Sequence, residues 1–209
     1  MQRLIEKYKQ EYFYYLLKIN NLPSILEHGI LSFNTVKSLQ MKSESFASKS
    51  VEKRRAERAP VCLSSGNNRS IHDLVPLYLT PRTPTLFMRL DLQGFLCFAV
   101  IRSQILFDPN IEFVFTDGNV GSKKTVFYYK AEDLNKIPWQ VIRAKYWTRF
   151  PDGTRKRNSE FLIYPKIDLH YISKIIVDKP KTKQIVERII ASKKTEHIEV
   201  GINPWFFFD

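Results

Sequence analysis

Short runs of aromatic, β-branched and other apolar residues recur along this chain, and charged or turn-forming residues separate them. Runs of this length and composition favour buried β-strands. They occupy residues 11–19, 94–101, 112–118, 124–129, 160–164 and 172–178, and a last one lies in the C-terminal segment 197–208. The chain is therefore predicted to fold around a β-sheet.

Helices are expected at fewer places between these strands. Asn20 and Asn21 offer a helix cap, Pro23 suits a first helical turn, and Gly29 favours the end of that helix. Residues 181–194 have the pattern of an amphipathic helix. These elements predict an α+β fold with a curved or split, mostly antiparallel sheet and flanking helices.

The size and cysteine usage of the chain limit its class. A length of 209 residues suits one compact domain, so residues 1–209 are expected to form a single domain. Cys62 and Cys97 are the only cysteines and form no CxxC pair, which predicts neither a zinc site nor a disulfide framework and fits a reduced, cytoplasmic setting. No run of 18 apolar residues and no signal-peptide pattern occurs, so neither membrane spanning nor secretion is expected.

The chain is strongly basic. It has 33 Lys and Arg residues against 21 Asp and Glu residues, for a formal net charge of +12. Such an excess fits a polyanionic partner such as nucleic acid, but a solvated basic face is an equally good explanation. Charge alone leaves both possibilities open.

Glu160 opens the apolar run 160–164. Burying an unpaired carboxylate is costly, so a glutamate at the entry of such a strand suggests a chemical role. Taken alone, a carboxylate on an edge strand or in a loop is the more common explanation. The residues around Glu160 must decide between the two.

A basic loop precedes Glu160. Its cationic side chains, which can hold phosphates through charge-assisted hydrogen bonds, are Arg149, Arg155, Lys156 and Arg157. The neighbouring Tyr146 and Trp147 can stack on nucleic-acid bases. The alternatives are a solvated loop and aromatic side chains that belong to the core.

A second basic cluster spans residues 53–58, inside the segment 48–58 whose spacing permits a helix. Guanidinium groups there can grip a diphosphate, although a charged, solvated helix face is the default explanation. No glycine-rich GxGxxG or GxxxxGKS motif is present, which argues against a Rossmann or P-loop nucleotide site. His72 and His170 are too isolated in the sequence to predict a metal centre.

Five segments, in their order and spacing, carry a family resemblance. They are FYYLLKINNLPSILEHGIL (13–31), VEKRR (51–55), IHDLVPLYLTPRTPTLF (71–87), EFVFTDGN (112–119) and the basic loop that ends in SEFLIY (159–164). Together they resemble the DarT family of DNA ADP-ribosyltransferase toxins. The resemblance extends over nearly the whole chain.

This resemblance implies an ADP-ribosyltransferase-like fold and the transfer of ADP-ribose from NAD to a base of single-stranded DNA, without a metal. It also implies a macrodomain antitoxin as partner, while a monomer is our default expectation. The family's catalytic glutamate falls on Glu160 and its active-site arginine on Arg55. The implied cofactor-binding residues are Tyr15, Asn21, Leu22 and Tyr78, and Arg149, Arg155, Lys156 and Arg157 are the expected nucleic-acid contacts.

The chain departs from the family at one strand. Members usually carry a Tyr-His-x-Thr sequence there, whereas this chain has Tyr15 in place of the histidine and Leu17 in place of the threonine. A tyrosine hydroxyl can donate a hydrogen bond to a ribose, but leucine cannot.

The expected chemistry follows from the bond that breaks. Loss of nicotinamide from ribose passes through an oxocarbenium-like centre that a carboxylate stabilises, and Glu160 is the candidate. Three alternatives remain open from the residues: RNA bases as acceptor, a protein acceptor, or a nucleic-acid-binding module without activity.

Overall fold

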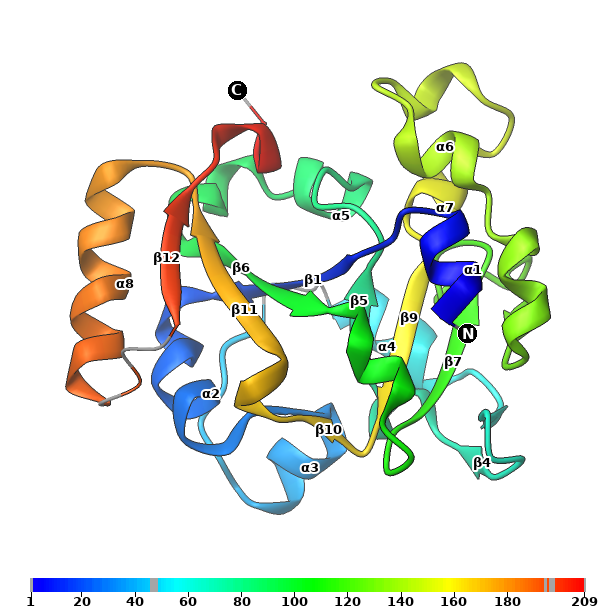
Figure 1. Cartoon of the computed structure of the whole chain (residues 1–209), viewed down its shortest axis with the longest axis horizontal. Coiled ribbons are helices and arrows are strands. Elements are labelled where there is room, and N and C mark those ends of the chain that lie inside the picture. The colour runs from blue at the N-terminus through cyan, green and yellow to red at the C-terminus, as the bar shows by residue number, and fades with distance from the viewer. Residues whose placement is uncertain (1, 46–48, 194, 196–197, 209) are drawn as a thin grey trace.

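The computed structural model describes residues 2–45, 49–193, 195 and 198–208. In this part of the chain, the centre is an eight-stranded sheet with the order β12-β11-β6-β1-β5-β9-β7-β8 (Figure 1). The strands are β1 (Tyr12–Lys18), β5 (Val75–Tyr78), β6 (Leu96–Arg102), β7 (Glu112–Thr116), β8 (Phe127–Tyr128), β9 (Glu160–Tyr164), β11 (Ile172–Val177) and β12 (Glu199–Ile202). Two short pairs join β2 (Ile30–Leu31) to β10 (Lys166–Ile167) and β3 (Val61–Cys62) to β4 (Asn68–Arg69).

The sheet is mostly antiparallel, with β11 and β12 as its parallel pair within the described residues. β1 pairs with β6 along its whole length, but it is registered with β5 only where Tyr14 lies opposite Tyr78. The sheet therefore consists of two well-paired halves that one short contact joins. The predicted α+β class with a mostly antiparallel sheet is confirmed.

Helices flank this sheet. The α-helices are α1 (Gln2–Lys7), α2 (Leu22–His28), α3 (Phe33–Ser38), α4 (Lys49–Ala56), α5 (Pro84–Phe87), α6 (Trp139–Arg143), α7 (Gly153–Arg157) and α8 (Pro180–Ser192). Short 3₁₀ turns are η1 (Ile19–Asn21), η2 (Ile71–Asp73), η3 (Leu90–Phe95), η4 (Ser103–Phe107), η5 (Ala131–Lys136), η6 (Trp147–Arg149), η7 (Leu169–Tyr171) and η8 (Pro204–Phe206). α8 lies beside β12 and β11, while α6 and α7 gather beyond β9 (Figure 1). None of the described helices is long and apolar enough to cross a membrane.

Two predicted helices fall close to their expected positions. α4 and α8 lie within the expected segments 48–58 and 181–194 apart from Pro180, and residues 48 and 194 are outside the described residues. α2 ends as predicted at Gly29, whose φ of 78° suits glycine. Asn21 occupies the predicted N-cap position, but its side chain makes no cap bond and instead exchanges two hydrogen bonds with the backbone of Glu44.

The core lies on both faces of the sheet. Alternation along β1 sends Phe13 and Leu17 into the largest buried cluster and Leu16 into a second cluster on the other face. The largest cluster also contains Val186 and Ile190 of α8. A third cluster covers the other half of the sheet. Core residues thus cover both faces of β1 and of β9.

Candidate active site

A cleft of about 610 Å³ lies along the weak junction between β1 and β5. Its lining includes Tyr15 and Leu17 of β1, Tyr78 of β5, Asn21, Arg55 of α4 and His72 of η2. The volume falls in the range of ordinary ligand sites. Four of the six residues predicted from the sequence as catalytic or cofactor-binding thus line one cavity: Arg55, Tyr15, Asn21 and Tyr78.

Glu160 lies beside this cleft, next to the lining residues Arg55 and Tyr78, but is not itself among the residues that line it. It opens β9 directly opposite Tyr78, and its side chain is 1% exposed. Its carboxylate accepts a hydrogen bond from Nη1 of Arg55 at 3.0 Å and one from the Val120 N–H at 3.3 Å. Its own N–H donates to Oγ1 of Thr116 at 2.9 Å. A buried carboxylate is thereby both paired and fixed in position.

Arg55 comes from α4 and is 14% exposed at its side chain. Burial on its own would lower the pKa of its guanidinium, but the charge of Glu160 and the hydrogen bond to it raise the pKa above the ordinary value. Arg55 therefore stays a cation beside the carboxylate.

Two tyrosines, Tyr15 and Tyr78, line the same cleft. Burial raises the pKa of Tyr15 to about 12. Two smaller effects act on the same pKa: the charge of Arg55 lowers it and the charge of Glu52 raises it. Burial and the charge of Glu160 also raise the pKa of Tyr78, whose hydroxyl is hydrogen-bonded with Thr85. Both hydroxyls stay protonated at neutral pH and can donate hydrogen bonds to a ligand.

Of the remaining predicted cofactor-binding residues, Asn21 lines the cleft and Leu22 does not. Asn21 lines the cleft, and its bonds to Glu44 fasten the segment around residue 44 to the end of β1. Leu22 is fully buried in the core and is not among the residues that line the cleft. Leu17 lines it with only 2% of its surface exposed.

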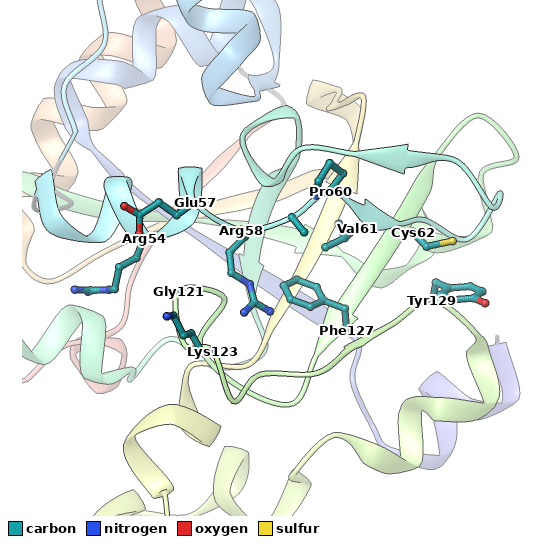
Figure 2. A pocket seen from close by; sticks show the side chains of 11 residues that line it. Arg54, Glu57, Arg58, Pro60, Val61, Cys62, Gly121, Lys123, Phe127 and Tyr129 are labelled. Atoms are coloured by element: carbon teal, nitrogen blue, oxygen red, sulfur yellow. The ribbon is translucent and has the colours of Figure 1, made fainter.

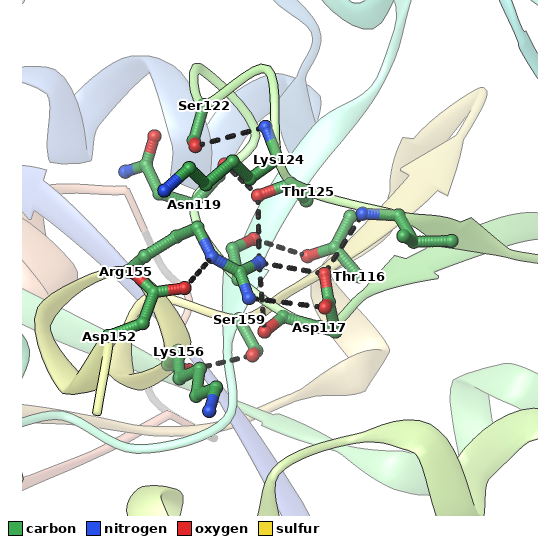
Figure 3. A network of polar contacts seen from close by, with 12 residues as sticks. Thr116, Asp117, Asn119, Ser122, Lys124, Thr125, Asp152, Arg155, Lys156 and Ser159 are labelled. Carbon is green, nitrogen blue, oxygen red and sulfur yellow. Dashed lines mark hydrogen bonds and ion pairs between the residues drawn. The ribbon is translucent and has the colours of Figure 1, made fainter. Parts of the chain in front are cut away.

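Arg155 braces the loop that reaches Glu160 (Figure 3). Its guanidinium bonds both carboxylate oxygens of Asp117, at 2.9 and 3.2 Å, as well as Asp152 and Oγ1 of Thr125. Thr125 in turn donates to the carbonyl of Asn119 at 2.7 Å. This network fixes the residue that precedes Val120, whose N–H contacts the Glu160 carboxylate. The predicted nucleic-acid contact of Arg155 is replaced here by contacts within the protein.

Arg157 is also turned inward, with 5% of its surface exposed. Its guanidinium donates to the carbonyls of Arg82, Val141, Ile142 and Ala144 at 2.6–2.9 Å. Burial and the nearby Arg82 lower its pKa to about 10, which still leaves it charged at neutral pH. The donors of Arg157 thus already have buried acceptors within the protein, and its predicted nucleic-acid contact stays a prediction.

The two other predicted nucleic-acid residues are accessible. Arg149 is exposed and its guanidinium lies 5.0 Å over the ring of Tyr146, which is 48% exposed. Lys156 is half-buried. Trp147 is partly covered by Phe87 and Phe208. A basic and aromatic surface thus lies on η6, immediately before α7.

Sequence reasoning missed several residues of the site. Thr116 and Val120 contact Glu160, and His72 lines the cleft with its Nε2 3.5 Å from a Glu52 carboxylate oxygen. A buried threonine at the end of an apolar strand was the available signal for Thr116. Among the described residues, no group of three His, Cys, Asp or Glu side chains is arranged to hold a metal.

A protein-family model for "ssDNA thymidine ADP-ribosyltransferase, DarT" matches residues 14–208. The chain belongs to the DarT family. It is therefore an NAD-dependent DNA ADP-ribosyltransferase, as the sequence resemblance implied.

Known DNA ADP-ribosyl transferases are similar along nearly the whole chain. A DNA ADP-ribosyl transferase of Thermus aquaticus is 30% identical over 204 residues, which are 93% of this chain and 88% of that protein. A DNA ADP-ribosyl transferase-DNA ADP-ribosyl glycohydrolase fusion protein of Thermosipho africanus is 32% identical over 93% of this chain, and the chain spans 49% of that protein.

Solved DarT structures share the fold. Thermus sp. 2.9 DarT in complex with ADP-ribosylated ssDNA is 25% identical, with a TM-score of 0.85 over 96% of this chain and 97% of that chain. The same protein in complex with NAD+ has a TM-score of 0.79 over 96% and 98% of the two chains. The ADP-ribosyltransferase-like fold predicted from the sequence is confirmed.

Proposed function

We propose that this chain transfers ADP-ribose from NAD to the thymine base of single-stranded DNA with Glu160 as the catalytic carboxylate. The observation that carries the proposal is the buried Glu160 carboxylate, paired with Arg55 beside a cleft lined by two protonated tyrosines. The ligands named for Thermus sp. 2.9 DarT, NAD+ and ADP-ribosylated ssDNA, support the choice of donor and acceptor.

The reaction exchanges one bond for another. The bond between the nicotinamide nitrogen and the ribose anomeric carbon breaks, and nicotinamide leaves with the bonding electrons. A ring nitrogen of thymine bonds to that carbon and loses its proton. In thymidine the ring nitrogen N1 carries the deoxyribose, so N3 is the nitrogen with a proton to give.

Glu160 serves both parts of this exchange. Its negative charge stabilises the positive charge that develops on the ribose, where hydrogen bonds to the sugar hydroxyls strengthen in the transition state. The same carboxylate accepts the N3 proton as the new bond forms. Arg55 remains a cation because Glu160 raises its pKa, so it acts as a hydrogen-bond donor that orients the pyrophosphate or the thymine carbonyls.

Binding of NAD is proposed to use the cleft between β1 and β5. The hydroxyl of Tyr15 takes the place of the family's usual histidine and donates to a ribose oxygen. Tyr78 packs against nicotinamide, and Asn21 holds the cleft edge through Glu44. Leu22 supports this wall from the core without reaching the ligand.

The partner and domain assignments are proposals of the same kind. We propose that residues 1–209 act as one ADP-ribosyltransferase domain, monomeric and cytoplasmic. A macrodomain antitoxin that removes the modification is the proposed partner, supported by the transferase-glycohydrolase fusion protein of Thermosipho africanus.

Intact-mass spectrometry of single-stranded oligonucleotides tests the proposal. Incubation with NAD should add one ADP-ribosyl group to an oligonucleotide with a single thymidine, and none to the same oligonucleotide carrying N3-methylthymidine. Matched RNA and a protein mixture serve as competing acceptors. Modification of the N3-methylated oligonucleotide would refute N3 as the acceptor, and labelling of RNA or protein alone would refute single-stranded DNA as the substrate.

A further inference from the structure

A second cavity, of about 530 Å³, lies beside α4 (Figure 2). Its lining and that of the catalytic cleft come from different sides of this helix. Glu52 and Arg55 line the cleft, whereas Arg54 lines the second cavity together with Glu57 and Arg58, which follow soon after it. This division follows from helical spacing, because residues three and four apart share a face.

A short piece of backbone separates the two cavities. Asn119 lines the catalytic cleft, the N–H of Val120 donates to the Glu160 carboxylate, and Gly121 lines the second cavity. Two residues of extended chain span about 7 Å. The second cavity therefore begins close to the catalytic carboxylate, on the far side of the loop that Arg155 braces.

The charge of the second cavity is positive. Arg54, Arg58 and Lys123 contribute cations, and Glu57 contributes a carboxylate. Arg54 and Lys123 are exposed, and no ion pair or hydrogen bond of either side chain exists within the described part of the chain. Both cations are thus available to an anionic ligand.

Aromatic side chains form the opposite wall. Phe127 and Tyr129 line the cavity, and the guanidinium of Arg58 lies 4.9 Å over the Phe127 ring (Figure 2). Tyr129 is 37% exposed, and Nζ of Lys130 lies 5.9 Å from the centroid of its ring. Cations that can hold phosphates, next to aromatic faces on which bases stack, are the pattern of a single-strand binding site.

We propose that this second cavity binds a nucleotide that flanks the target thymidine in the single-stranded DNA substrate. Arg54 and Lys123 hold its phosphate, and its base stacks on Tyr129 beside the Arg58–Phe127 pair. A base must be unpaired to stack there, which favours a single strand over a duplex. The inference rests on the proposed function, because it adds a second contact for the same acceptor strand.

Steady-state kinetics of the double variant R54A/K123A tests the role of the cations. The KM for a single-thymidine oligonucleotide should rise about tenfold, and the salt dependence of binding should become shallower, because two phosphate contacts are lost. The KM for NAD should stay unchanged. The matched control K181A/R188A removes the same charge from exposed positions on α8 and should change none of these values.

Truncation of the oligonucleotide locates the contact. For the wild type, removal of the flanking nucleotides on one side of the thymidine should raise the KM about tenfold. R54A/K123A should respond much less to the same truncation, because the contact is already lost. Equal responses of the two proteins to every truncation would overturn the proposal.

Alkylation of Cys62 measures occupancy without catalysis. Cys62 lines the second cavity and is half-buried, whereas Cys97 is fully buried, so a small alkylating reagent should modify Cys62 alone in the folded protein. A single-stranded oligonucleotide, added without NAD, should slow this modification at least fivefold. A duplex oligonucleotide at the same concentration should not slow it. Unchanged alkylation would overturn the proposal.

Different results would refute the proposed function and the role of the second cavity. If the wild type modifies thymidine but R54A/K123A has the KM of the wild type and Cys62 is not protected, the second cavity has no part in DNA binding and the proposed function stands. If the wild type modifies no DNA at all, the proposed function falls and the inference with it.

Discussion

The guanidinium of Arg55 donates a hydrogen bond of 3.0 Å to the carboxylate of Glu160, although the two residues are 105 positions apart in the sequence. The pair joins α4 to the first residue of β9, and the Val120 N–H contacts the other carboxylate oxygen. A charge buried to this degree is stable only when it is paired and hydrogen-bonded. The site is therefore pre-organised for chemistry that needs a fixed negative charge.

The variant E160Q tests the role of this charge. Glutamine keeps the size of the side chain but neither stabilises the ribose cation nor accepts the N3 proton, so the rate of transfer should fall at least about 100-fold. Transfer of labelled ADP-ribose from NAD to an oligonucleotide measures this loss. E199Q, which removes an exposed carboxylate from β12, should keep the wild-type rate. Retention of a tenth or more of the activity in E160Q would assign the catalytic role elsewhere.

Removal of Arg55 should destabilise the fold through Glu160. R55A leaves a buried carboxylate without its cation, which costs about 3 kcal/mol of unfolding free energy. The double variant R55A/E160Q should recover more than half of that loss, because the uncompensated charge is gone. Urea unfolding of the two single variants and the double variant measures the coupling. Additive effects would show that the pair contributes no interaction energy.

The positions of the strands could be predicted because each strand depends on local sequence. The runs at 11–19, 94–101 and 160–164 became β1, β6 and β9, since apolar alternation and β-branched content act within a few residues. The cleft could not be predicted in this way. It arises where β1 and β5 share only the pair Tyr14 and Tyr78, and that register depends on packing across the whole sheet.

The roles of individual arginines show the same limit. Glu160 and Arg55 came from the family resemblance, and the structure brings them together. Arg149 and Arg157 occupy one basic loop and look alike in sequence. In the structure, however, Arg149 is exposed and Arg157 is buried, with 5% of its surface exposed. The difference depends on α7, which turns Arg157 toward the carbonyls around α6. The spacing of residues in the sequence does not show in which direction the Arg157 side chain points.

Tyr15 gives a pH dependence with a definite sign. Its pKa is about 12 in the folded protein and close to 10 in an unfolded chain, so the folded state keeps a proton that the unfolded state releases. The free energy of unfolding should therefore fall as the pH rises through this window, and Y15F should show a shallower fall. Urea unfolding between about pH 9 and pH 11 measures the slope.

Tyr171 provides the matched control for Tyr15. Its pKa is also raised to about 12, by burial and by its hydrogen bond to Asp108, but it is not among the residues that line the cleft. Y171F should flatten the alkaline fall in the same way and leave the KM for NAD unchanged. Y15F alone should raise the KM for NAD about tenfold, because it loses a donor to the ribose. An unchanged KM in Y15F would remove its hydroxyl from NAD binding.

Arg155 should affect the rate of transfer more than DNA affinity. R155A releases Asp117 and Thr125, and with them the loop that holds the Val120 N–H against Glu160. We expect kcat to fall about tenfold and the KM for the oligonucleotide to rise by a smaller factor, because the released loop also carries Lys123. The opposite result, a raised KM with an unchanged kcat, would show that Arg155 contacts DNA.

Loss of Arg157 should lower the stability of the fold, whereas loss of Arg149 should weaken DNA binding. R157M leaves several buried carbonyls without their donor, so the free energy of unfolding should fall by about 3 kcal/mol. R149M removes an exposed cation and should change that energy by less than about 0.5 kcal/mol, while it raises the KM for the oligonucleotide. Urea unfolding and acceptor kinetics of both variants separate the two roles. A stable R157M with weakened DNA affinity would show instead that the buried hydrogen bonds of Arg157 contribute little to the fold and that Arg157 serves DNA binding.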